Sequence, residues 1–90
     1  MMLTRDLVGK VVVTLDGFHV GKVEELEISE DWKVQNLVLR LTSDAAREIG
    51  IRLSFKPRGI VSTAHVKGVA DYITIDVEKA QLKEAVKPHK

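Results

Sequence analysis

The sequence predicts a mainly β domain: a small closed or partly open β-barrel of five to six strands, with a short helix near 43–50 and a C-terminal helix. Apolar and polar residues alternate with a period of two along most of the chain, as they do in half-buried strands. Turn-forming residues recur about every 8 to 12 positions. The 90 residues, of which 44% are hydrophobic and 30% charged, suffice for one modest core. We therefore expect a single domain over 1–90, with the barrel in 5–77 and the C-terminal helix and tail in 78–90.

The first strand is expected to begin near position 11. Val11, Val13 and Leu15 share one face, which is taken as the inner one, so Val12 should point outward. The dipeptide Asp16-Gly17 follows, and both residue types tolerate the left-handed backbone of a hairpin turn. The sequence therefore predicts a hairpin here.

The second strand contains a break in its alternation. Val23 stands at an odd position, whereas Leu26 and Ile28 stand at even ones. One extra residue near Glu24-Glu25, a β-bulge, would bring all three side chains to the same face and bend the strand. Small barrels need such bends to close. A polar turn, Ser29–Trp32, then leads into the next strand.

The third strand has the clearest pattern in the chain. Leu37, Leu39 and Leu41 form an inward row. Between them, Arg40 and Val38 are expected on the outer face. After this strand the alternation stops, and a helix of about two turns is predicted over 43–50, since Ser43 can cap it and Gly50 can end it.

The second half of the chain returns to strand patterns. Residues 51–56 are predicted as a strand with Phe55 in the core, and 60–66 as another, ending in a turn at 67–68. Residues 69–77 form the last predicted strand. Its parity places Asp71 on the apolar face, where the carboxylate could accept hydrogen bonds from the backbone of that turn. A helix capped by Asp76 should follow, through about Val86.

Composition excludes several kinds of site. With no cysteine, the chain cannot form a disulfide framework, a thiolate metal site or a cysteine nucleophile. The three histidines are far apart in sequence, with no metal-ligand spacing, and the acids between Glu24 and Asp31 have no nucleophile near them. We expect no catalytic, cofactor-binding or metal-binding residue, no cofactor and no enzymatic activity. The chain also has no apolar run of 18 residues and no leader, so we expect a cytoplasmic protein without membrane insertion.

Two segments together resemble a known family. In the segment 7–28, a glycine, an apolar strand, Asp-Gly and then Val-Gly-Lys-Val with an acidic-apolar strand follow one another. This order resembles the opening of a PRC-barrel domain, and 66–75 is similar to the closing element of that family. The likeness extends over about 5–77. It implies a stand-alone member of the family.

The resemblance also implies a role. Known homes of the fold are the cytoplasmic domain of the photosynthetic reaction-centre H subunit, the C-terminal domain of the ribosome-maturation factor RimM, and small archaeal proteins. These domains dock to other proteins, and some stand-alone archaeal members are implicated as adaptors in cell division. No residue of the H subunit's proton pathway can be matched to this sequence.

Two sets of residues are singled out. The first set is expected to shape turns and curvature, and it comprises Gly9, Asp16, Gly17, Gly21 and Asp71. The second set is apolar or aromatic, with outward parity or a position at a hairpin tip. It is predicted to form an interface and comprises Val12, Trp32, Val38 and Tyr72.

The favoured function is a non-enzymatic adaptor that self-associates, with a homodimer as the expected form. An acidic segment around 24–31 and a basic segment over 33–67 are complementary in charge and could guide the association. The alternative is an RNA- or ribosome-associated module that uses the basic segment on phosphates. Nucleic acid is the less favoured partner because 14 Lys and Arg are balanced by 13 Asp and Glu. The basic segment also lacks stacking aromatics apart from Phe55.

Overall fold

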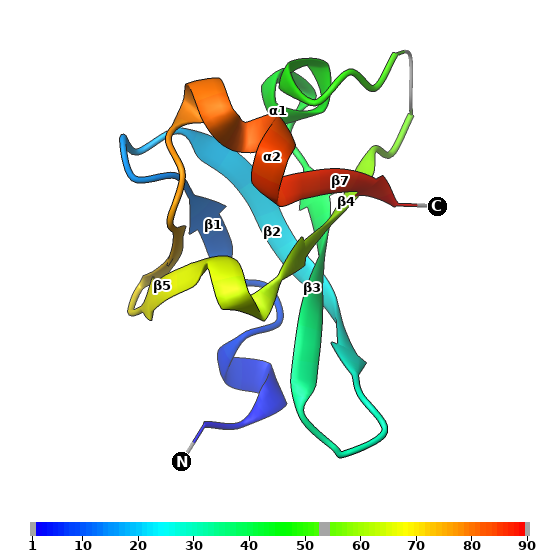
Figure 1. Ribbon diagram of the computed structural model, residues 1–90, viewed down its shortest axis with the longest axis vertical. Coiled ribbons are helices and arrows are strands. Elements are labelled where there is room, and N and C mark those ends of the chain that lie inside the picture. Colours follow the sequence, from blue (N-terminus) through cyan, green and yellow to red (C-terminus); the bar gives the residue numbers. More distant parts are fainter. Residues whose placement is uncertain (1, 53–54, 90) are drawn as a thin grey trace.

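Seven strands form one curled sheet in the computed structural model, which describes residues 2–52 and 55–89 (Figure 1). The strands lie side by side in the order β5-β6-β1-β2-β3-β4-β7. In chain order the elements are η1 (Thr4–Asp6), β1 (Val11–Val13), β2 (His19–Ile28), β3 (Val34–Leu41), α1 (Ser43–Glu48), β4 (Arg58–Ser62), η2 (Thr63–His65), β5 (Val66–Val69), β6 (Tyr72–Ile75), η3 (Lys79–Gln81), α2 (Leu82–Ala85) and β7 (Val86–His89), where η marks a 3₁₀ turn.

The sheet combines an antiparallel meander with one parallel pair. Strands β2, β3 and β4 pair antiparallel in succession, whereas β1 pairs parallel to β6. Strands β5 and β7 are the two edges, so the sheet does not close. The predicted mainly β fold is confirmed in its partly open form, with seven strands instead of five or six.

The inner face of the sheet and the two α-helices enclose one apolar core. Both helices lie at the same end of the sheet (Figure 1) and contact each other. The buried cluster consists of Val12, Val20, Val23, Leu37, Leu39, Leu41, Ala45, Ala46, Ile49, Val61, Ile73, Ile75, Leu82, Ala85 and Val86. The inward row that the third strand predicted is therefore confirmed.

The bulge predicted in the second strand is confirmed. Val23 pairs with Leu39 and Glu25 with Val38, so Glu24 is the extra residue. A second register shift follows between Glu27 and Ile28. Beyond it the strand leaves the core, and the Ile28 side chain is 48% exposed, so the expectation that it points inward is wrong.

The parity predicted for the first strand is wrong. Val12 is fully buried in the core, while Val11 and Val13 lie half-buried on the outer face and Leu15 is exposed. Three consecutive valines satisfy either parity, so the pattern alone cannot choose between them. Pairing decides, because Val12 lies between Gly21 of β2 and Ile73 of β6. Val12 is therefore not available to an interface.

Val38 is also buried, with an exposed fraction of 2%, although it does point to the outer face. Its neighbours across the ladder are Glu25 and Ile60. Ion pairs between acids of β2 and Arg58 of β4 lie over this part of the outer face, and the aliphatic stems of such side chains cover apolar surface. The outward parity of Val38 does not make it part of a free surface.

The predicted central helix is confirmed as α1. Its N-cap is Thr42 instead of Ser43, and the Thr42 hydroxyl accepts a hydrogen bond from the backbone N–H of Ala45. Gly50 follows the helix with a φ of 88°. The strand predicted over 51–56 is wrong for the residues described there, and Phe55 is 94% exposed instead of buried. Leu53 and Ser54, which belong to the same predicted strand, lie outside the described residues.

The strands predicted over 60–66 and 69–77 are divided differently. Strand β4 ends at Ser62, a 3₁₀ turn follows, and β5 and β6 form a hairpin. Asp71 lies exposed at the tip of this hairpin, so its predicted place on the apolar face is wrong. The chain reverses there, with Ala70 N–H donating to the Tyr72 carbonyl at 2.9 Å. The carboxylate consequently faces solvent.

The C-terminal region contains a strand that the sequence did not predict. The expected helix is shorter and comprises η3 and α2, while Val86 begins β7, which pairs with β4. Gly59 of β4 permits this pairing: a Cβ at position 59 would lie 2.9 Å from Val86 Cγ1 and 3.0 Å from Leu41 Cδ2. Asp76 does not cap the helix; its carboxylate contacts His65 Nδ1 at 2.8 Å.

Candidate interaction surfaces

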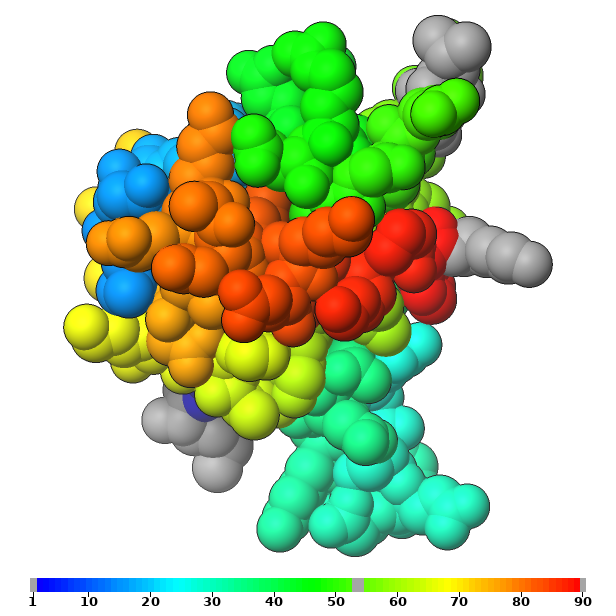
Figure 2. Space-filling view, turned by 45° about the horizontal axis from the view of Figure 1, so that its top comes forward, coloured from blue at the N-terminus to red at the C-terminus, as the bar shows by residue number. Residues whose placement is uncertain are grey.

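The β2–β3 hairpin projects beyond the rest of the molecule, and its tip stands clear of the neighbouring surface (Figures 1 and 2). The tip is closed by two backbone hydrogen bonds, from Trp32 N–H to the Ser29 carbonyl at 2.9 Å and from Ser29 N–H to the Lys33 carbonyl at 2.8 Å. The Ser29 hydroxyl also accepts from Lys33 N–H and contacts the Asp31 carboxylate. The turn is therefore well defined although few apolar contacts support it.

Trp32 occupies the strained position of this turn. Its φ is 64°, the left-handed region, and it is the one non-glycine residue there among those described. A bulky side chain in this region costs about 1–3 kcal/mol. The indole is 87% exposed, so packing within its own molecule does not offset that cost. A strained and solvated tryptophan is the strongest indication of an external contact in the structure.

An apolar cavity of about 260 Å³ lies between the β5–β6 hairpin, the start of β3 and the N-terminal 3₁₀ turn. The lining is apolar except for one threonine and consists of Met2, Leu7, Val34, Leu37, Thr63, Val66, Val69 and Ile73. The partly open barrel thus leaves a hydrophobic recess beside the base of the projecting hairpin.

A second apolar patch lies on the outer face of β6, β1 and β2. Tyr72 is 54% exposed, as its predicted outward parity implies, and it pairs with Val11 across the parallel ladder. Val13 lies on the same face opposite His19. The neighbours of Tyr72 are thus Val11 and Val13, not the Val12 and Val38 that the sequence predicted.

The acidic and basic segments meet each other within the molecule. Arg40 donates to Glu24 Oε2 from Nε at 3.0 Å and from Nη2 at 2.7 Å. Arg58 Nη2 lies 2.6 Å from Glu24 Oε1 and 2.7 Å from Glu25 Oε2. The Arg40 hydrogen bonds, followed by those of Arg58, hold the pKa of Glu24 below its ordinary value. These ion pairs connect β2, β3 and β4. The four side chains are thus paired within the molecule and are not free charges for a partner.

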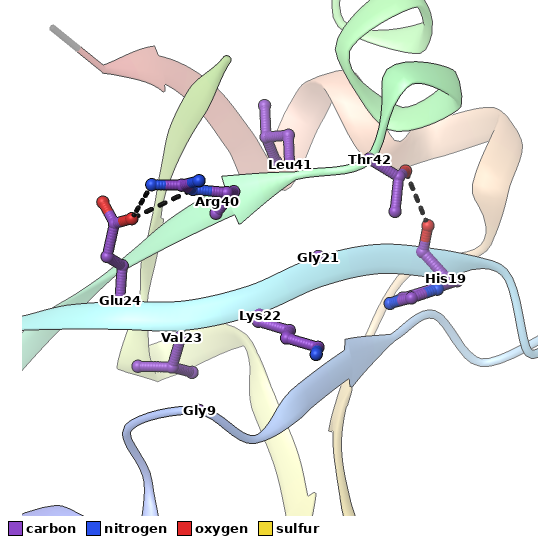
Figure 3. A pocket seen from close by; sticks show the side chains of 9 residues that line it. All are labelled: Gly9, His19, Gly21, Lys22, Val23, Glu24, Arg40, Leu41 and Thr42. Atoms are coloured by element: carbon purple, nitrogen blue, oxygen red, sulfur yellow. Dashed lines mark hydrogen bonds and ion pairs between the residues drawn. The ribbon is translucent and has the colours of Figure 1, made fainter. Parts of the chain in front are cut away.

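A shallow groove of about 420 Å³ runs along β2 beside this network (Figure 3). The backbone of Gly21 forms part of its floor, and a Cβ there would lie 2.1 Å from the Arg40 carbonyl oxygen. Arg40 is bound to Glu24, and the Thr42 hydroxyl donates to the His19 carbonyl at 3.0 Å. No nucleophile adjoins a free acid–base pair among the residues lining this groove, so it does not resemble a catalytic site.

The other turn residues occupy the ends of strands. Gly9 and Gly17 have φ values of 89° and 83°. The Asp16 carboxylate accepts hydrogen bonds from the Thr14 hydroxyl and from Lys79 N–H, which ties the β1–β2 turn to η3. The Thr14 hydroxyl, followed by the backbone of Lys79, lowers the pKa of Asp16. Asp16 therefore joins segments that are 63 positions apart in sequence.

The described part of the chain lacks the features of a metal centre or a membrane anchor. Residues 2–52 and 55–89 hold no group of three or more His, Cys, Asp or Glu side chains able to bind a metal. No helix within those ranges is long and apolar enough to cross a bilayer. The distinctive features of this small, partly open β domain are the surface patches described above.

Comparison with protein families shows the family to which this domain belongs. The profile of the PRC-barrel domain matches residues 1–82, so the chain belongs to the PRC-barrel family. This is a family of non-catalytic domains that often serve as protein-interaction modules. A comparison with curated proteins gave no match. The resemblance noted from the sequence is thereby confirmed.

Proposed function

We propose that this protein is a non-enzymatic interaction module, a PRC-barrel domain that acts as an adaptor and forms a homodimer through the hairpin end of the molecule. The observation that carries the proposal is Trp32, 87% exposed and held in a left-handed conformation. Aromatic anchors of this kind dominate the energetics of protein interfaces. Trp32 and Tyr72 remain the proposed interface residues, whereas Val12 and Val38 do not.

The exposed apolar side chains agree with an interface at this end. Met2 is 52% exposed and lines the cavity, Ile28 is 48% exposed on the hairpin, and Val69 is 37% exposed on the edge strand β5. Edge strands and clustered apolar side chains favour association with another chain. A small domain also gains stability when association buries such groups.

The process in which the adaptor acts is proposed on the family resemblance alone. Stand-alone members point to cell division as the process and to the cytoplasm as the place. The RNA-associated alternative receives no support from Arg40, Arg47 and Arg58, since each of the three forms an ion pair with an acid. A phosphate-binding surface needs basic groups that are free to replace counterions.

Sedimentation velocity on the full chain, from low to high micromolar concentration, tests the proposal. We expect a monomer that converts to a dimer as the concentration rises, and no binding to single-stranded RNA at moderate salt. A monomer over the whole range would contradict self-association. Salt-sensitive binding to RNA would favour the alternative function.

A further inference from the structure

The projecting tryptophan and the apolar cavity lie close together on one face of the molecule. Val34 lines the cavity and is two residues from Trp32, so their Cα atoms are at most about 7 Å apart, the span of two residues of extended chain. Strand β3 begins at Val34, so it connects the tip directly to the cavity wall. Trp32 itself is not among the residues that line the cavity. One molecule thus presents an unfilled recess beside an aromatic side chain that does not enter it.

We propose that Trp32 of one copy inserts into the apolar cavity of a second copy, and that the contact is reciprocal. This inference rests on the proposed self-association and names the parts that make it. A two-fold interface brings the same patch of both copies together, so every contact between the copies occurs twice, once in each direction. The tryptophan and the cavity adjoin each other. In a dimer with two-fold symmetry, each copy can therefore insert its tryptophan into the cavity of the other, and no site is left for a third copy.

The size and lining of the cavity suit this occupant. Its volume of about 260 Å³ is below the roughly 300–1,000 Å³ that is typical of small-molecule sites. Seven of its eight lining residues are apolar, and the lining includes the long, adaptable side chain of Met2. An indole ring is a large, rigid apolar group that buries much surface for little loss of side-chain entropy.

The distribution of charge favours a second copy as the occupant. Glu24 and Glu25 are paired with arginines within the molecule, but the hairpin segment 26–33 beyond them contains three acids and one base, a formal charge of −2. Exposed Arg5 and Lys67 lie on η1 and β5, two of the elements beside the cavity, whereas the Asp6 carboxylate accepts a hydrogen bond from Leu3 N–H at 2.7 Å. The tip carries exposed Glu30 and Asp31 beside Trp32. An acidic tip that approaches basic cavity edges gives complementary potentials across the interface.

A matched set of variants tests the inference by sedimentation velocity. Trp32→Asn removes the indole, and asparagine is tolerated in the left-handed region, so the turn is kept. Phe55→Asn is the control, because Phe55 is 94% exposed and precedes β4, which starts opposite Arg40, at the end of β3 away from the hairpin tip. We expect Trp32→Asn to raise the dimer dissociation constant by at least about 30-fold. The control should change it by less than about threefold.

Mixing two variants tests whether the cavity receives the indole. Val69→Asp places a charge at the cavity and should abolish the dimer by itself, while its own Trp32 stays intact. Met2→Asp serves the same purpose if Val69→Asp fails to fold. A mixture of Trp32→Asn and Val69→Asp should recover a dimer of intermediate affinity, because one copy supplies the tryptophan and the other supplies the open cavity. A chain that carries both Trp32→Asn and Val69→Asp should not form a dimer when mixed with Trp32→Asn, because neither chain then has a tryptophan.

The outcomes separate this inference from the proposed function. A wild-type protein that stays monomeric overturns self-association itself. A wild-type dimer that Trp32→Asn leaves unchanged overturns the insertion but not the self-association. Weakening by Trp32→Asn without recovery in the mixture also overturns it, since Trp32 would then contact a surface of the second copy other than the cavity.

Discussion

The two halves of the β2–β3 hairpin share one hydrogen-bonded ladder but have opposite environments. At the base, Val23 and Leu39 are buried in the core, and the Glu24–Arg40 ion pair lies on the other face. At the tip, Ile28 is 48% exposed and Trp32 87% exposed. The base is thus covered on both faces, and the tip on neither.

The difference shows which part of the hairpin serves the fold and which part is free for another role. Backbone pairing alone contributes little net stability, because the unfolded chain makes the same hydrogen bonds to water. Side-chain burial therefore fixes the base. The tip keeps its shape through turn hydrogen bonds around Ser29 and accepts a strained backbone at Trp32. Residues of the tip can consequently be changed without loss of the fold.

The largest expected effect on stability comes from truncating a leucine of the hairpin base, and an isoleucine of the tip serves as the comparison. Leu39→Ala removes a fully buried side chain and should lower the free energy of unfolding by about 3–4 kcal/mol. Ile28→Ala, on the same hairpin, should lower it by less than about 1 kcal/mol. Urea unfolding at low protein concentration measures both. Equal losses would show that the tip packs as the base does.

A glycine of the base gives the next largest effect. Gly21→Ala would place a Cβ 2.1 Å from the Arg40 carbonyl oxygen, and backbone cannot move aside easily. We expect a loss of about 2–3 kcal/mol in the free energy of unfolding. Gly68→Ala is the matched control, since no atom lies within 4 Å of its Cβ position, and it should be nearly neutral. Similar values for the two variants would disprove the close approach of β2 and β3.

A substitution at the tip should act in the opposite direction. Trp32→Asn relieves the strained backbone, so the monomer should gain about 0.5–1 kcal/mol of stability. The measurement is urea unfolding at concentrations below the dimer range, with Phe55→Asn as the control that leaves stability unchanged. A destabilised Trp32→Asn monomer would mean that the indole packs within its own chain.

The smallest effect concerns pH. The pKa of Glu24 lies below its ordinary value of 4.5 in the folded protein, mainly because of the Arg40 hydrogen bonds. Its contribution to stability is therefore complete above the unfolded pKa and is lost as the pH falls through the lower folded pKa. Glu24→Gln should flatten the decline of stability below about pH 4.5, and Glu30→Gln at the tip should not. If the free energy of unfolding fell equally with decreasing pH in the wild type and in Glu24→Gln, the contribution of Glu24 would be refuted.

Sequence patterns predicted the parts of the fold in which residue types alternate clearly. The inward leucines of β3, the bulge at Glu24, and helix α1 followed by Gly50 all match the structure. The valines of β1 could not be oriented, because three β-branched residues fit either face. Strand β7 could not be predicted from Val86–His89, since it contains one buried residue and forms only against the space that Gly59 leaves.

The candidate site was predictable in part for the same physical reason. A tryptophan in a polar turn suggests exposure, and Trp32 is exposed. The cavity depends on where β5, β3 and η1 stop short of one another, and no local pattern encodes this tertiary arrangement. Val38 is likewise buried on the outer face, beneath the strands that carry the Arg58–Glu25 ion pair, and sequence parity cannot detect such cover.

The most direct test uses Trp32 itself, because it is the one tryptophan in the chain. Its emission wavelength and its quenching by acrylamide can be followed over the concentration range in which sedimentation detects dimers. The account predicts a solvent-exposed indole in dilute protein, with a shift to shorter wavelength and protection from the quencher as dimers form. An indole that stays fully accessible while dimers form would contradict it.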